Sequence, residues 1–302
     1  MKIEVHAAPG TSEYQQAGVL PGMPCGLLFG LQHELSAALG ADDSSVRWSY
    51  VNYPASFGPA TGGGPTYDKS VNLGAEQLVA DLDNSYNRDP EIRFVLTGYS
   101  QGGHVIWKAL SILLNRAKGV LGEGNWPNPR EILERIVSVV MFGNPTRAPG
   151  QAYPGASKVE IGQGITGNYL SQAAQEQWMP NTTGGWSEYV VPGDIYSSVV
   201  VADSYADEVY RSVMHLATPW DDISEFNQMC LNFVQSGGLV DALVRDGAPV
   251  NAMRVLTTAY AFLWFYIGDF PHVHYHDRPV FEGNTALQHA AQMLARRIRV
   301  PQ

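Results

Sequence analysis

The sequence predicts an α/β fold with a central, mostly parallel β-sheet and one helical insertion. Strand-like and helix-like patterns alternate through the first half of the chain, which is typical of strands joined by helical crossovers. From residue 197 to about 266 the pattern is mainly helical, and an amphipathic helix ends the chain. We therefore expect a core at 1–196, a helical insertion (a cap or linker) at 197–268, and a return to the core at 269–302.

The individual elements follow from short β-branched and aromatic runs for strands, and from apolar residues at helical spacing for helices. Loops rich in Gly and Pro separate the first elements. The expected strands are 2–7, 46–52, 93–97, 136–142 and 188–191. The expected helices are 25–39, 69–86, 101–113 and 287–298.

Composition narrows the classes of partner. The 302-residue chain carries a formal net charge of -10, which repels phosphate backbones and anionic lipid head groups. We expect no nucleic acid partner, and a neutral substrate such as a lipid or polysaccharide ester fits better. Cys25 and Cys230 form no CxxC pair, which excludes a zinc knuckle; two free thiols are favoured, and a disulfide between them stays open.

Neither a secretory signal nor a membrane span is expected. The first residues lack a long apolar run followed by a small-residue cleavage site. The most apolar stretch, 253–267, is interrupted by Arg254 and is shorter than the ~20 residues that cross a bilayer.

The strongest chemical signal is Gly98-Tyr99-Ser100-Gln101-Gly102, a GxSxG pattern between a predicted strand and a predicted helix. This context is typical of the nucleophile elbow of α/β-hydrolases, whereas the alternative is a serine that only caps a helix. The helix start leaves backbone N–H groups free, so the N–H of Gln101 is a candidate oxyanion donor. Ser100 is the predicted nucleophile.

The acid and the base must follow Ser100, because the chain order in this fold is Ser, Asp or Glu, His. Asp194 comes just after a predicted strand and is the preferred acid. For the base, His272, His274 and His276 cluster before the last helix. On a strand these three would share a face and imitate a metal site, but a catalytic histidine with loop neighbours explains them, so we expect no metal. The other aspartates considered are Asp203, Asp207, Asp221, Asp222 and Asp269.

Several short motifs, in order along the chain, resemble those of the cutinases. They are residues 8–13 (APGTSE, with Pro9 where Arg is usual), 98–102 (GYSQG), 142–145 (FGNP), 193–196 (GDIY) and 272–275 (HVHY). The resemblance implies a cutinase-like α/β-hydrolase that needs no cofactor. It favours His272 as the base, and it implies Thr11 as the second oxyanion residue beside Gln101.

Within that superfamily the chain looks most like the lysin B family of mycobacteriophages. The disulfides of cutinases are missing, and a helical stretch separates Asp194 from His272. The resemblance implies an esterase that cuts the bond between mycolic acids and arabinogalactan during phage lysis. It also implies contact with mycobacterial outer-membrane lipids. Such a protein is made in the host cytoplasm without a signal peptide and acts at the host envelope once lysis has begun.

Two other functions remain open. One is a cutinase-like or PE-PPE-type esterase of smaller lipid esters, against which the missing secretory signal and disulfides argue. The other is an inactive hydrolase fold that binds the cell wall, against which the complete set of Ser100, Asp194 and His272 argues.

Overall fold

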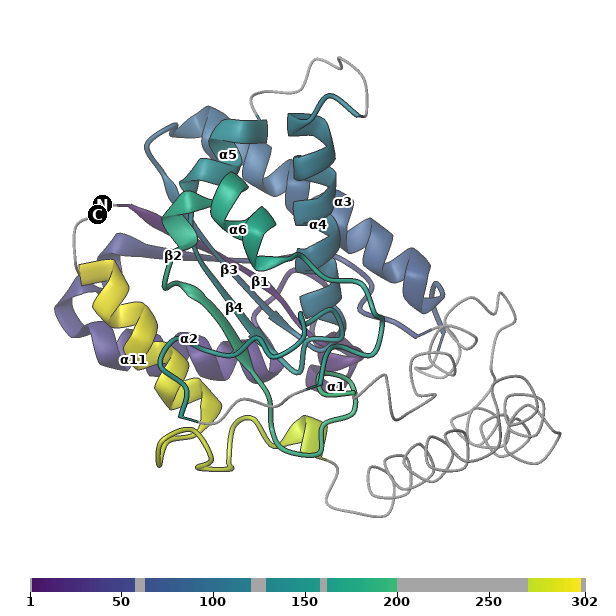
Figure 1. The fold of residues 1–302 in the computed structure, drawn as a ribbon, viewed down its shortest axis with the longest axis vertical. Helices are drawn as coiled ribbons and strands as arrows, with labels where there is room; N and C mark the ends of the chain where they lie inside the picture. The colour runs from purple at the N-terminus through teal and green to yellow at the C-terminus, as the bar shows by residue number, and fades with distance from the viewer. Residues whose placement is uncertain (1, 58–62, 121–128, 158–161, 200–270, 300–302) are drawn as a thin grey trace, which may run out of the picture.

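The computed structural model describes residues 2–57, 63–120, 129–157, 162–199 and 271–299. These residues form a five-stranded, fully parallel sheet with the strand order β2-β1-β3-β4-β5 (Figure 1). The strands are β1 (Ile3–Ala8), β2 (Val46–Tyr50), β3 (Arg93–Tyr99), β4 (Ile136–Phe142) and β5 (Trp186–Tyr189). The predicted α/β fold with a parallel sheet is confirmed.

Helices cover both faces of the sheet, as a parallel sheet requires. On one face the core contains apolar side chains of α3 (Tyr67–Arg88), α4 (Gln101–Ala117) and the short α5 (Pro129–Arg135). On the other face lie α2 (Gly26–Leu39) and the C-terminal α11 (Ala286–Arg299), which pack against each other (Figure 1). The remaining described helices are α1 (Glu13–Ala17), α6 (Gln172–Trp178) and the 3₁₀ turns η1 (Gly40–Ser45), η2 (Pro180–Thr182) and η4 (Pro271–Val273).

The alternation of side chains along β3 shows how the sequence divides between the two layers. Phe94 and Leu96 face the α3–α4 layer, whereas Val95 between them faces the α2–α11 layer. All three are buried, which explains why the strand reads as a continuous apolar run.

Only β4 has the bounds that the sequence predicted: β1 covers 3–8 rather than 2–7, β2 ends at Tyr50 rather than at residue 52, and β3 and β5 also differ. β3 continues past Thr97 to Tyr99, because Gly98 pairs with Met141 of β4 and with Ala8 of β1. β5 covers 186–189 rather than 188–191, because Tyr189 pairs with Phe142, the last residue of β4. The residues after Tyr189 therefore have no residue of β4 beside them. The expected helical insertion lies almost wholly outside the described residues.

The parallel arrangement fixes where a site can form. The carboxyl ends of parallel strands meet at one edge of the sheet, which is where α/β folds bind their ligands. Thr11 follows β1, Ser100 follows β3, Gly143 follows β4 and Asp194 follows β5, so all four belong to this edge.

Candidate active site

Ser100 occupies a sharp turn between β3 and α4. Its backbone has φ 53° and ψ −120°, a positive-φ conformation that a non-glycine residue rarely adopts and that costs of order 1–3 kcal/mol. Two backbone hydrogen bonds hold the turn: the Ser100 N–H donates to the Phe142 carbonyl (2.9 Å), and the Gly103 N–H donates to the Ser100 carbonyl (2.9 Å). The side chain remains partly exposed at the sheet edge. This is the geometry expected of a nucleophile elbow.

The glycines on either side of Ser100 are required sterically. A Cβ at Gly98 would lie 2.7 Å from the carbonyl group of Gly102. A Cβ at Gly102 would lie 1.7 Å from the carbonyl oxygen of Ala8, at the end of β1. The GxSxG spacing therefore lets the start of α4 pack directly against the backbone that leads from β1 to Thr11.

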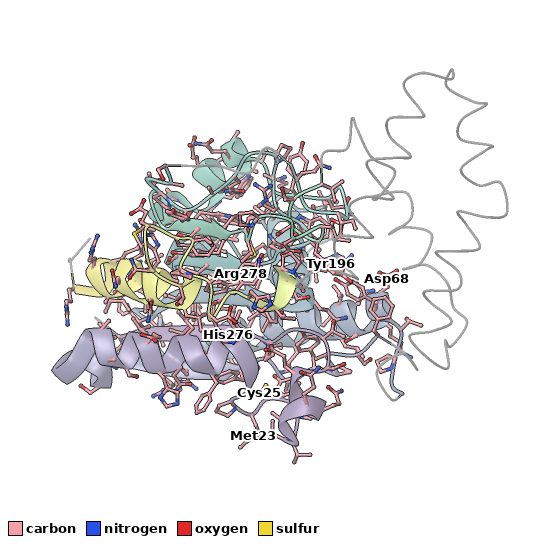
Figure 2. All side chains as sticks on the ribbon, turned by 90° about the horizontal axis from the view of Figure 1, so that it is seen from below. Met23, Cys25, Asp68, Tyr196, His276 and Arg278 are labelled. Atoms are coloured by element: carbon pink, nitrogen blue, oxygen red, sulfur yellow. The ribbon has the colours of Figure 1, made fainter. Side chains whose placement is uncertain are left out.

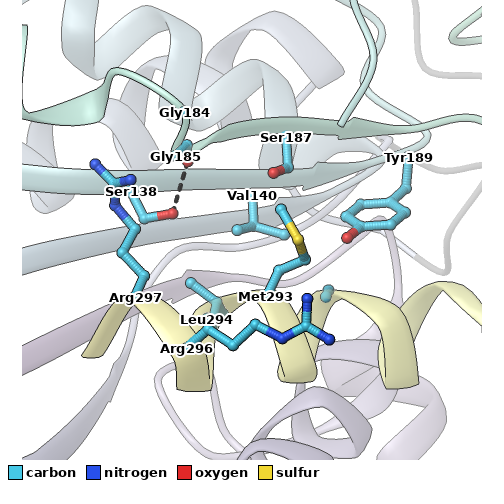
Figure 3. A pocket seen from close by; sticks show the side chains of 11 residues that line it. Ser138, Val140, Gly184, Gly185, Ser187, Tyr189, Met293, Leu294, Arg296 and Arg297 are labelled. Carbon is cyan, nitrogen blue, oxygen red and sulfur yellow. Dashed lines mark hydrogen bonds between the residues drawn. The ribbon is translucent and has the colours of Figure 1, made fainter. Parts of the chain in front are cut away.

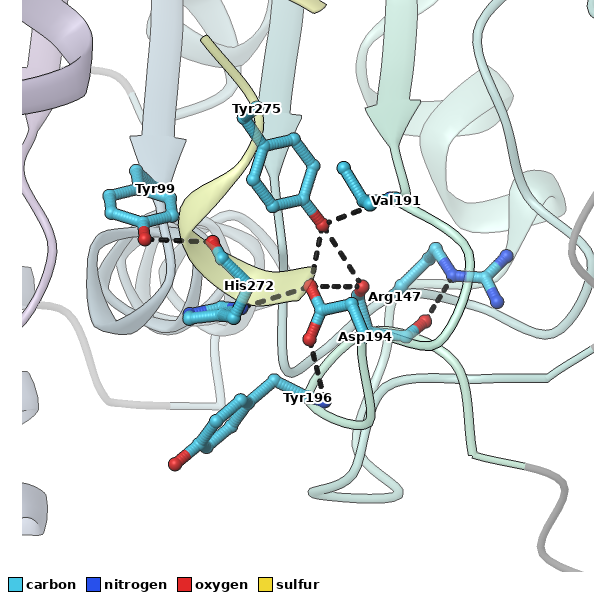
Figure 4. A network of polar contacts seen from close by, with 8 residues as sticks. Tyr99, Arg147, Val191, Asp194, Tyr196, His272 and Tyr275 are labelled. Atoms are coloured by element: carbon cyan, nitrogen blue, oxygen red, sulfur yellow. Dashed lines mark hydrogen bonds and ion pairs between the residues drawn. The ribbon is translucent and has the colours of Figure 1, made fainter. Parts of the chain in front are cut away.

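Asp194 and His272 form a buried pair across 78 residues of sequence. Oδ2 of the fully buried Asp194 accepts hydrogen bonds from His272 Nδ1 (2.9 Å), the Tyr275 hydroxyl (2.5 Å) and the Ser197 hydroxyl (2.9 Å) (Figure 4). Oδ1 accepts from the Tyr196 N–H (3.0 Å). Because a carboxylate only accepts hydrogen bonds, the His272 tautomer in this pair carries its proton on Nδ1.

The Asp194 carboxyl stays ionised despite its burial. Burial by itself raises the pKa of Asp194, but the adjacent His272 and the hydrogen bonds from His272, Tyr275 and Ser197 outweigh that effect and leave the pKa lowered. An ionised, fully hydrogen-bonded acid next to an imidazole is what orients a general base.

The structure also brings His272 to the Ser100 turn. Gly143 directly follows Phe142, whose carbonyl accepts the hydrogen bond from the Ser100 N–H. A Cβ at Gly143 would lie 2.6 Å from His272 Cε1. The ring of Tyr99 stacks on the imidazole at a centroid distance of 5.3 Å, and its hydroxyl donates to the His272 carbonyl (2.9 Å). His272 Nε2 is buried and has no hydrogen-bond partner among the described residues. The ring nitrogen that a base must keep free for a hydroxyl is therefore available.

Gln101 contributes more than the N–H that the sequence indicated. It is the first residue of α4, and no hydrogen bond to its N–H is found within the described part of the chain. Its buried side chain donates to the Ser56 carbonyl (3.0 Å) and accepts from the Ser70 hydroxyl (3.3 Å). These contacts tie the start of α4 to the loop after β2 and to α3, a role that sequence reasoning missed.

Thr11 lies in the loop that follows β1, close to Ser100. A Cβ at the preceding Gly10 would lie 2.7 Å from the ring of Tyr99 and 3.4 Å from Ser100 Cβ. The structure therefore brings the Thr11 loop and the Gln101 N–H to the same end of β3.

The other candidate histidines point elsewhere. His272 lies in the 3₁₀ turn η4 and the next residues form a turn, so the three histidines do not share the face of a strand. His274 Nδ1 contacts Asp277 (2.9 Å), and the exposed His276 contacts the Val273 carbonyl (3.1 Å). Among the described residues no group of three or more His, Cys, Asp or Glu side chains is arranged to hold a metal ion. The rival acids Asp203, Asp207, Asp221, Asp222 and Asp269 lie outside the described residues.

Tyr275 and Ser197 are site residues to which sequence reasoning assigned no role. Tyr275 stands at the end of the HVHY motif, and its buried hydroxyl contacts both Asp194 and the Val191 N–H (3.3 Å). Ser197 comes three residues after Asp194 and gave no signal of its own, because its role depends on how the loop folds back.

A separate crevice of about 300 Å³ opens between β4, β5 and α11 (Figure 3). It is lined by Ser138, Val140, Met293 and Leu294 together with other residues of these elements. The lining extends to Tyr189 at the end of β5 but includes none of Ser100, Asp194 and His272, so this crevice is distinct from the Ser100 region.

Cys25 is buried, whereas the nearby Met23 is exposed at the edge of the molecule (Figure 2). Burial, and then the neighbouring Glu13, raise the pKa of the Cys25 thiol to about 12. Cys230 lies outside the described residues. Across the described ranges, no helix combines the length and apolar character that crossing a membrane requires.

The five-stranded parallel sheet, the elbow at Ser100 and the buried Asp–His pair define the α/β-hydrolase class. The family model of cutinase matches residues 2–198, and the chain therefore belongs to the cutinase family.

Comparison with known proteins gives two kinds of relative. Endolysin B of Mycobacterium phage L5 is 27% identical over 166 residues, which is 54% of this chain and 58% of the relative. A cutinase of Kineococcus radiotolerans is 34% identical over 155 residues, 51% of this chain and 45% of the relative. The chain spans about half the length of the curated relatives it matches.

Among solved structures, lysin B from Mycobacteriophage D29 aligns with a TM-score of 0.51 and 22% identity over 90% of this chain and 95% of that chain. At this identity the match shows the shared fold. The resemblance to cutinases and lysin B proteins that the motifs suggested is confirmed.

Proposed function

We propose that this protein is a serine esterase that uses Ser100, His272 and Asp194 as nucleophile, base and acid. The observation that carries the proposal is the buried 2.9 Å contact between Asp194 and His272, with Nε2 left free beside the positive-φ Ser100 turn. Membership of the cutinase family supports the same chemistry.

The mechanism follows from this arrangement. Ser100 attacks the acyl carbonyl while His272 Nε2 takes the hydroxyl proton, and Asp194 stabilises the imidazolium that forms. The N–H groups of Gln101 and Thr11 bind the developing oxyanion. His272 then protonates the leaving alcohol, and water activated by the same base hydrolyses the acyl enzyme.

We further propose that the substrate is the ester between mycolic acids and arabinogalactan. The similarity to proteins named Endolysin B from mycobacteriophages L5 and D29 supports this substrate, as does the net charge of -10, which favours a neutral ester over an anionic lipid. In this role the protein acts at the host envelope after other proteins have breached the inner barriers.

The proposed domain organisation keeps 1–196 and 269–302 as one hydrolase core, with 197–268 inserted between them. The packing of α11 on α2 and the contact of His272 with Asp194 support a single core made from both ends of the chain. Deleting the insertion and joining its ends with a short linker tests this organisation, because a core that folds alone keeps a cooperative unfolding transition.

Hydrolysis of p-nitrophenyl esters from butyrate to palmitate tests the activity. We expect wild type to be active and Ser100→Ala to lose activity by at least about 10³-fold. Ser111→Ala is the matched control, because Ser111 lies on α4 and its hydroxyl bonds, among the described residues, only the Trp107 carbonyl (2.9 Å). Equal inactivity of wild type and Ser100→Ala on every ester would overturn the proposal and favour a cell-wall binding protein. Release of mycolic acids from purified mycolyl-arabinogalactan then tests the substrate.

A further inference from the structure

Glu13, the first residue of α1, bridges two backbone segments at the site. Its Oε2 accepts from the Gly10 N–H (2.6 Å), and its Oε1 accepts from the Leu27 N–H (2.7 Å) at the start of α2. Hydrogen bonds to an ionised carboxylate are the strong ones among protein hydrogen bonds. The carboxylate therefore fixes the loop after β1 relative to a helix of the core.

The surroundings of Glu13 are shaped to admit it. Gly26 has φ +59°, and a Cβ there would lie 2.0 Å from Glu13 Oε1. Any other residue at this position would therefore both strain the backbone and occupy the space of the carboxylate.

The loop is pinned on both sides of Thr11. Before it, the Gly10 N–H is held by Glu13; after it, the Ser12 N–H donates to the Ala55 carbonyl (2.7 Å), with Ser12 at φ 64°. Between these two bonds the Thr11 N–H has no hydrogen-bond partner among the described residues. An N–H left free between two fixed neighbours is preorganised to bind an anion.

We propose that Glu13 is a positioning residue whose carboxylate, by holding the Gly10 N–H, keeps the Thr11 N–H in place for the oxyanion. This inference rests on the proposed esterase function and adds a residue that touches neither substrate nor reacting atoms. It concerns the transition state, so its loss lowers kcat more than it changes KM.

The charge of Glu13 matters to this role, because a protonated carboxyl has lost one acceptor. Burial raises the pKa of Glu13, and the hydrogen bonds from Leu27 and Gly10 and the nearby His272 partly offset that rise. The titratable groups that interact with it are Tyr14 on α1, Cys25 before α2, Tyr50 and Tyr53 at and beyond β2, Tyr99 on β3, and His272.

The test is Glu13→Gln, which keeps the shape but replaces one acceptor oxygen by an NH₂ group that faces an N–H. We expect kcat on p-nitrophenyl butyrate to fall roughly 10- to 100-fold, below the 10²–10³-fold loss of a whole oxyanion donor, with KM within about twofold. The matched control is Glu4→Gln on β1: Glu4 is also a glutamate with hydrogen bonds, being buried and bonded to Ser85 and Arg88, but it lies at the opposite end of the sheet. Glu4→Gln should keep wild-type kcat.

The pH profile separates positioning from a general loss of structure. Protonation of Glu13 removes the same acceptor that Glu13→Gln lacks, so the ratio of kcat/KM between wild type and Glu13→Gln should shrink as the pH is lowered. An active wild type with an unchanged kcat in Glu13→Gln at every pH would overturn this inference alone. An inactive wild type would instead overturn the proposed function. A fall in kcat/KM by the same factor at every pH would assign Glu13 a merely structural role, which also contradicts the proposal.

Discussion

Gly143→Ala tests whether the position of His272, and not only its presence, sets the rate. Gly143 has φ +56°, so an alanine there costs about 1–2 kcal/mol of backbone strain. The new Cβ would lie 2.6 Å from His272 Cε1, 2.9 Å from Nδ1 and 3.1 Å from Asp194 Oδ2, against ordinary contacts of 3.4–4 Å. The imidazole must therefore move by about 1 Å, or the backbone must move away from it.

A displacement of about 1 Å costs roughly 100-fold in rate when reacting groups must be aligned. We therefore expect kcat/KM for p-nitrophenyl butyrate to fall about 100-fold, which corresponds to about 2.7 kcal/mol. Urea unfolding should show a loss of stability of about 1–2 kcal/mol from the strain.

Gly150→Ala is the matched control, because Gly150 has φ +66° but its added Cβ would meet none of the described residues within 4 Å. It should lose similar stability and keep its kcat/KM. If Gly143→Ala retains more than half of the wild-type kcat/KM while Ser100→Ala is inactive, the reasoning about the position of His272 is refuted.

Three further predictions concern buried polar groups. Tyr275→Phe removes a 2.5 Å hydrogen bond to the Asp194 carboxylate, so we expect a loss of about 1.5–3 kcal/mol in urea unfolding; an unchanged midpoint would contradict it. Asp194→Asn keeps the shape of the side chain but removes the charge that stabilises the imidazolium, so kcat should fall about 10³- to 10⁴-fold in steady-state assays. A loss of less than tenfold would exclude Asp194 as the acid. Burial raises the pKa of Glu188 to about 7, against partial offsets from Trp186, Asn144 and Arg147. Because the folded state holds this proton more tightly than the unfolded state, the free energy of unfolding should rise by about 3 kcal/mol as the pH falls from about 7 to 4.5. Glu188→Gln should remove that share of the pH dependence, and parallel curves of unfolding free energy against pH for the two proteins would argue against it.

The sequence predicted those elements whose pattern is local. The strand at 136–142 was predicted with its observed bounds, because a long β-branched run is buried on both faces. The short α5 and α6 were not predicted, since seven residues give too little periodicity to detect. The end of β3 was placed two residues early, because Gly98 has no strand preference and belongs to the strand only through its two neighbours.

The site divides in the same way. Ser100 was predictable because the elbow depends on five consecutive residues and their flanking elements. The choice of His272 over His274 and His276 needed the resemblance to a family, since spacing treats the three alike. The bridge made by Glu13 was not predictable from pattern, because it depends on the backbone of Leu27, which only the packing of α2 brings within reach.

The geometry of His272 is determined by several independent contacts at once. Nδ1 is bonded to Asp194, the main-chain carbonyl is held by the Tyr99 hydroxyl, and the rings of Tyr99 and Tyr196 lie 5.3 and 4.6 Å from the imidazole. A catalytic group must be held within about 0.5 Å, and one hydrogen bond leaves the ring free to pivot about that bond. The stacked ring of Tyr99, the tilted ring of Tyr196 and the close approach of Gly143 remove that freedom. Two substitutions that release the same rotation of His272 should therefore not be additive, and a double-mutant cycle between Tyr99 and Gly143 measures that coupling.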